Sequence, residues 1–100
     1  MSTETLTVAE GARLVLIASA LQEVAEELEA LPYARVTGNV DVLPRIQRAA
    51  GELTEDALIA LDAHREALGV RDDAVYRWTT PMPVVEVVAQ LRGAAQAVTG

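Results

Sequence analysis

Residues 14–31 read LVLIASALQEVAEELEAL, and their apolar positions recur in steps of three and four. This spacing predicts an amphipathic helix whose apolar seam resembles that of a coiled coil and is buried against other helices. A seam of this kind carries no reactive group, so it indicates an architecture and not a reaction. The seam consists of Leu14, Ile17, Leu21, Val24, Leu28 and Leu31.

Local start and stop signals extend this first helix to residues 7–31. Thr7 followed three residues later by Glu10 is a capping box, in which both side chains satisfy backbone donors of the first turn. Pro32 cannot continue a helix, because it lacks the N–H group and its ring clashes with the preceding turn. We therefore expect a loop after Leu31.

Similar signals predict two further helices. Asp41 suits the cap of a helix over residues 41–68, and Gly69 suits its end. Pro81 suits the first turn of a third helix, over residues 81–98.

The predicted fold is a single all-α domain over residues 1–100, the size of one globular unit. A short loop makes the first two helices an antiparallel hairpin, and the third, shorter helix packs against it. The first helix carries glutamates in its C-terminal half but is apolar nearly all round in its N-terminal half. We therefore expect oligomerisation to complete the fold.

Five residues are candidates for partner binding. Val15 and Leu16 lie outside the seam of the first helix, and Ile59 lies on the charged side of the second. A homodimer or a heteromer would bury them, which favours a protein partner or a second copy of the chain. Tyr76 and Trp78 follow the second helix, where they either plug the end of the helical pair or anchor a partner.

Composition excludes several chemistries. The chain has fifteen acidic residues and eight cationic residues, all of them arginine. The resulting net charge of −7 disfavours nucleic acid as a partner. The absence of cysteine excludes disulfides and zinc–thiolate sites. His64 is the only histidine, and without an acid, nucleophile or second ligand nearby we expect it to be a core or interhelical residue. The sequence predicts no catalytic residue, no cofactor and no metal.

The longest apolar run, residues 14–21, is too short to span a bilayer, so we expect no membrane insertion. Residues 1–10 carry two acids and no base, unlike a secretory signal peptide. The expected location is the cytoplasm, or the exterior after export without a cleavable signal peptide.

The acidic, cysteine-free chain with its predicted helical hairpin resembles the small helical proteins of actinobacterial type VII secretion, the WXG100 group. That family has Trp-x-Gly in the hairpin loop, where residues 33–38 here read YARVTG, and Trp78 follows the second helix. The resemblance therefore rests on architecture, and no functional residue is carried over. It implies a dimeric helical partner protein.

The function we expect is that of a non-catalytic helical interaction or accessory protein, such as a secretion-associated subunit. One alternative is an acidic immunity protein or antitoxin that inhibits a basic partner, which predicts one contiguous acidic face. A second alternative is a small helical enzyme, which would need a pocket around His64.

Overall fold

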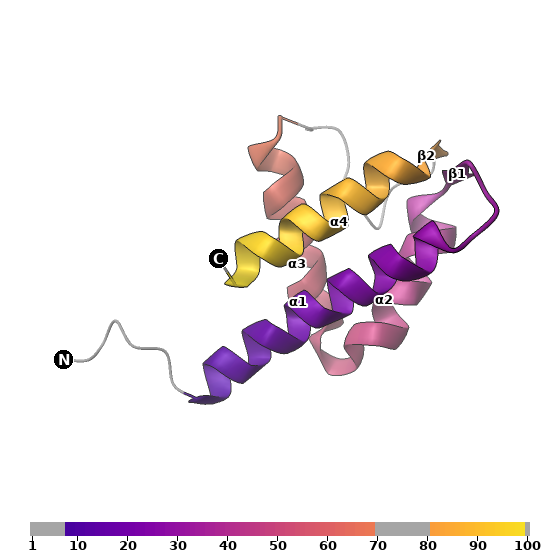
Figure 1. Ribbon diagram of the computed structural model, residues 1–100. Helices are drawn as coiled ribbons and strands as arrows, with labels where there is room; N and C mark the ends of the chain where they lie inside the picture. The colour runs from indigo at the N-terminus through magenta and orange to yellow at the C-terminus, as the bar shows by residue number, and fades with distance from the viewer. Residues whose placement is uncertain (1–7, 70–80, 100) are drawn as a thin grey trace.

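The structure is a computed structural model that describes residues 8–69 and 81–99 (Figure 1). It confirms the all-α class, because the only strands in this part of the chain are two residues long. The helices are α1 (Val8–Glu29), α2 (Leu43–Ala50), α3 (Thr54–Ala67) and α4 (Val84–Thr99), with a π-helical turn η1 (Gly38–Val42) and a 3₁₀ turn η2 (Gly51–Leu53). The strands are β1 (Arg35–Val36) and β2 (Met82–Pro83).

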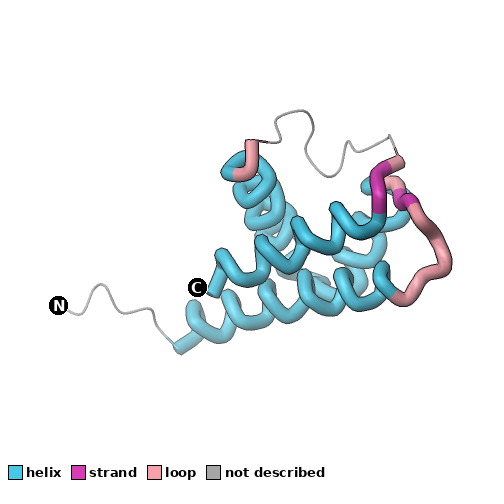
Figure 2. Tube along the Cα trace, turned by 45° about the horizontal axis from the view of Figure 1, so that its top comes forward, coloured by secondary structure: helices cyan, strands magenta, loops and turns pink. Residues whose placement is uncertain are grey.

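Helices α1 and α4 lie side by side and run in opposite directions (Figures 1 and 2), and they form the most extensive helix contact of the fold. Helices α2 and α3 pack behind this pair in Figure 1, where α3 crosses α4. The predicted hairpin of helices 7–31 and 41–68 is not confirmed, because the helix that lies along α1 is the C-terminal one.

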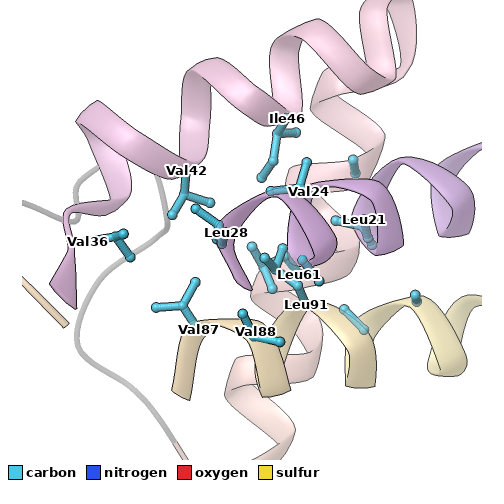
Figure 3. Packing of buried hydrophobic residues seen from close by; sticks show 14 of the residues in the cluster. Leu21, Val24, Leu28, Val36, Val42, Ile46, Leu61, Val87, Val88 and Leu91 are labelled. Carbon is cyan, nitrogen blue, oxygen red and sulfur yellow. The ribbon is translucent and has the colours of Figure 1, made fainter. Parts of the chain in front are cut away.

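The core forms around the apolar seam of α1. Leu21, Val24 and Leu28 have no exposed surface, which confirms that the predicted seam is buried. Figure 3 shows these side chains surrounded by others from every remaining helix. The surrounding residues include Val42, Ile46, Leu61, Val87 and Leu91.

The prediction of one continuous helix over residues 41–68 is wrong, because the helix is interrupted at Gly51. We call this interruption the break. Gly51 has φ 56° and ψ −119°, a backbone conformation that side chains with a Cβ rarely adopt. The hydroxyl of Thr54 donates a hydrogen bond of 2.6 Å to the Gly51 carbonyl, which satisfies one backbone acceptor at the break. Helix α3 then starts in a new direction.

The break also changes which face of this segment is buried. In α3 the buried residues are Ala57, Leu61 and Arg65, at successive steps of four. Leu53, just before α3, is only partly buried, and Leu68, just after it, is exposed. Arg65, by contrast, has only 2% of its surface exposed.

The chain enters α2 through the turn η1 and not through a helix cap at Asp41. The Asp41 carboxylate accepts a hydrogen bond of 2.7 Å from the backbone N–H of Thr37, which closes the turn on itself. Pro44 lies in the first turn of α2, a helix position that tolerates proline.

A short antiparallel strand pair lies at one end of the α1–α4 layer, where α1 ends and α4 begins (Figure 1). Val36 of β1 pairs with Met82 of β2, and the backbone N–H of Val84 donates a 3.0 Å hydrogen bond to the carbonyl of Ala34. Because β2 leads directly into α4, this pairing places the start of α4 beside the end of α1. Helix α4 can then return along α1 in the opposite direction.

The burial of the seam predicts a large difference between two leucine truncations. Leu21→Ala should lower the free energy of unfolding by about 2–5 kcal/mol, because a fully buried side chain leaves a cavity. Leu53→Ala should cost less than about 2 kcal/mol, because Leu53 is only partly buried at the break. Urea titration of both variants checks the order, and an equal loss would contradict the assigned core.

The conformation of Gly51 predicts opposite effects at two glycines. Neither Gly51 nor Gly11 has a heavy atom within 4 Å of the position a Cβ would take. Gly51→Ala should destabilise by about 1–3 kcal/mol, because alanine is strained at this backbone conformation. Gly11→Ala should stabilise by about 0.5–1 kcal/mol, because Gly11 lies within α1. Thermal unfolding of both variants tests the sign of the stability change. A Gly51→Ala protein at least as stable as the natural chain would contradict the strained backbone conformation at Gly51.

Candidate functional site

The three described partner-binding candidates are all exposed. Val15, Leu16 and Ile59 have 55%, 59% and 60% of their surface exposed, respectively. Tyr76 and Trp78 lie outside the described residues. Val15 and Leu16 are neighbours on the outward side of α1, whereas Ile59 belongs to α3.

Ile59 lines a groove of about 410 Å³ between the first half of α1, α3 and the end of α4. Its lining is mainly aliphatic, from Leu14 and Ile17 of α1, Ile59 and Ala60 of α3, and Val98 of α4. The groove is open to solvent and falls within the size range of ligand sites, about 300–1,000 Å³. Val15 and Leu16 do not line it, so the structure separates the predicted partner residues into two surfaces.

An ion pair connects α1 and α3 at this groove. The Arg13 guanidinium donates a hydrogen bond of 2.5 Å to the Asp56 carboxylate, and both residues line the groove together with Glu10. This hydrogen bond, together with the attraction between the two charges, raises the pKa of Arg13 above its ordinary value. Arg13 is thus a charged residue in the lining of the groove, and the carboxylate of Asp56 already neutralises its charge.

The other end of α1 carries a second set of ion pairs. Glu27 contacts Arg48 at 2.6 Å and Arg45 at 3.5 Å, both on α2. Glu29 accepts two hydrogen bonds, of 2.6 and 2.8 Å, from Arg92 of α4, and these bonds lower the pKa of Glu29. The glutamates therefore connect α1 to both neighbouring helices and leave little positive charge free at this end.

His64 packs against α4 at Gly93. A Cβ at position 93 would overlap with the His64 imidazole, with its Cε1 atom at 2.7 Å. The helices can cross here only because Gly93 has no side chain. His64 is partly buried and does not line the groove, so its surroundings are those of an interhelical residue.

Sequence reasoning found Ile59 but missed the rest of the groove. Glu10, Arg13 and Asp56 were not candidates, because their proximity depends on how α1 crosses α3. The only signal in the sequence was that oppositely charged residues occur on two helices, and this is true of many exposed residues that do not line a groove. Within residues 8–69 and 81–99, no group of three or more acidic or histidine side chains could hold a metal ion.

None of the helices described in the structure is long and apolar enough to cross a bilayer. Comparison with known proteins finds no matching family model, curated protein or solved structure. The resemblance to secretion-associated helical proteins stays a prediction.

The contact between His64 and Gly93 predicts a rescue experiment. Gly93→Ala should lower the free energy of unfolding by about 1–3 kcal/mol, because the added methyl group forces the imidazole or the helix to move. In a His64→Ala background the same substitution should cost far less. A double-mutant cycle by urea denaturation measures the coupling, and additive effects would show that the two positions do not touch.

Proposed function

We propose that the protein is a non-catalytic helical interaction protein that associates with a second copy of itself through the outward face of α1. The observation that carries the proposal is an uncharged surface in the first half of α1. Val15 and Leu16 project from it, flanked one turn away by Ala12 and Ser19. Solvent-facing helix positions are usually charged or polar, so two adjacent exposed apolar side chains are typical of a contact surface.

The charge distribution supports a second copy as the occupant. The acidic chain repels itself at most orientations, since its net charge is −7. On the outward face of α1 the first carboxylates after this apolar patch are Glu23 and Glu26. A two-fold antiparallel pairing would place the Ala12 of one copy near Ser19 of the other, where small side chains let the helices approach closely. Val15 and Leu16 would then cover each other at the centre.

The expected association is weak. A dimer would bury four side chains, Val15 and Leu16 of each copy, which are a little over half exposed in the single chain. Their burial would contribute about 3–7 kcal/mol before the cost of association. A dissociation constant of 1 mM corresponds to about 4 kcal/mol, and one of 1 μM to about 8 kcal/mol. Even 7 kcal/mol corresponds to a dissociation constant of only about 10 μM, and the cost of association weakens the dimer further, so we expect it to form only at high protein concentration.

Sedimentation equilibrium up to roughly 500 μM tests the proposal, because even a dissociation constant of about 1 mM leaves a measurable fraction of dimer at that concentration. We expect a monomer–dimer equilibrium that Leu16→Glu abolishes by placing like charges at the contact. Val85→Glu is the matched control, because Val85 is 77% exposed at the start of α4, away from this face. A monomer at all concentrations, or an equal effect of both substitutions, would overturn the proposal.

A further inference from the structure

The groove beside Ile59 is a second apolar surface, and its chemistry differs from that of the outward face of α1. Its lining is aliphatic on all three helices, and the ion pair between Arg13 and Asp56 satisfies the nearest charges. An aliphatic groove between helices can receive the apolar side chains of a partner helix. The adjoining charges indicate which kind of helix that is.

One face of α3 is acidic along its length. Glu55 and Glu66 are exposed and spaced by helical turns from the exposed Ile59, so an apolar residue lies within a row of carboxylates. Glu52, in the preceding turn η2, continues the row. Ile59 belongs both to this row and to the lining of the groove, so the groove opens beside the row.

Among the described residues, no arginine forms an ion pair with Glu52, Glu55 or Glu66. Arg13 is paired with Asp56, and Arg35 lies in β1, beyond the other end of α1. Arg45 and Arg48 contact Glu27, in the half of α1 that lies away from the groove. Arg92 is held by Glu29 in that same half. Among the described residues, the surface next to the groove is thus negatively charged and accessible.

We infer that this groove binds a basic amphipathic helix of a partner protein. The partner's apolar side chains would enter the groove against Ile59, and its lysines or arginines would follow the carboxylates of α3. Two helices lying side by side present charges at the same spacing per turn, which matches a row that repeats every three or four residues. A second copy of this chain fits poorly here, because it would bring its own carboxylates against this row.

The inference goes beyond the proposed self-association and does not depend on it. The groove excludes Val15 and Leu16, so a variant that is monomeric through Leu16→Glu should bind a basic helix as well as the natural chain does. A variant with a damaged groove should keep its monomer–dimer equilibrium. Failure of one proposal can therefore be distinguished from failure of the other.

The test uses a fluorescein-labelled synthetic peptide of leucine and lysine, with leucine at helical spacing. Two peptides serve as controls: one has glutamate in place of every lysine, and one has the same composition in a scrambled, non-amphipathic order. Fluorescence anisotropy should show saturable binding of the amphipathic basic peptide, weakened by added salt. The acidic peptide should not bind, and the scrambled peptide should bind at least about ten-fold more weakly.

Substitutions locate the binding surface. Ile59→Lys and Glu55→Lys should each weaken binding by about ten-fold or more, since the first replaces the apolar contact by a positive charge and the second reverses a negative charge beside the groove. Glu86→Lys is the matched control, with the same change in net charge on the exposed start of α4. It should weaken binding by no more than about two-fold.

Three outcomes would overturn the inference. Equal losses for Glu55→Lys and Glu86→Lys would show that the peptide responds only to net charge. Equal binding of the scrambled peptide would show that no helical face is recognised. Loss of self-association in Ile59→Lys would show that a second copy covers the groove.

Discussion

The apolar seam of α1 is the constraint on which the rest of the structure depends. Its central side chains, Leu21, Val24 and Leu28, are fully buried, yet α1 is longer than any other helix and cannot be covered by one of them. Helix α4 covers one side, and α2 and α3 cover the other. The interruption of the helix at Gly51 lets α2 and α3 lie at an angle to each other, and both contact α1.

The part of the fold that sequence could predict is the part set by local periodicity. The seam and the all-α class were predicted correctly, because burial on one face imposes the helical period directly on the chain. The prediction of one helix over residues 41–68 was wrong, because it continued the helix through Gly51. Gly51 is a typical helix stop signal, and Thr54 followed by Glu55 and Asp56 is a typical helix start signal. The sequence therefore contained the information needed to predict the break.

The candidate sites divide in the same way. Exposure of Val15 and Leu16 could be predicted, since it depends only on the face of one helix. The groove could not, because it needs α1, α3 and α4 at particular angles and no local pattern encodes a crossing angle. The same limit applies to His64. The sequence predicted a core or interhelical residue, but its contact with Gly93 depends on where α3 meets α4.

The pairing of β1 with β2 has a consequence for how fast the protein folds. Helical proteins usually fold quickly, because most of their contacts join residues that are close in sequence. Here the largest helix contact joins the first and last helices, and the strand pair that aligns them closes a loop of roughly 50 residues. The entropy of that closure must be overcome before α4 covers the seam. Folding should thus be slow for an all-α chain of this length, with α4 docking late on a loosely packed assembly of the other three helices.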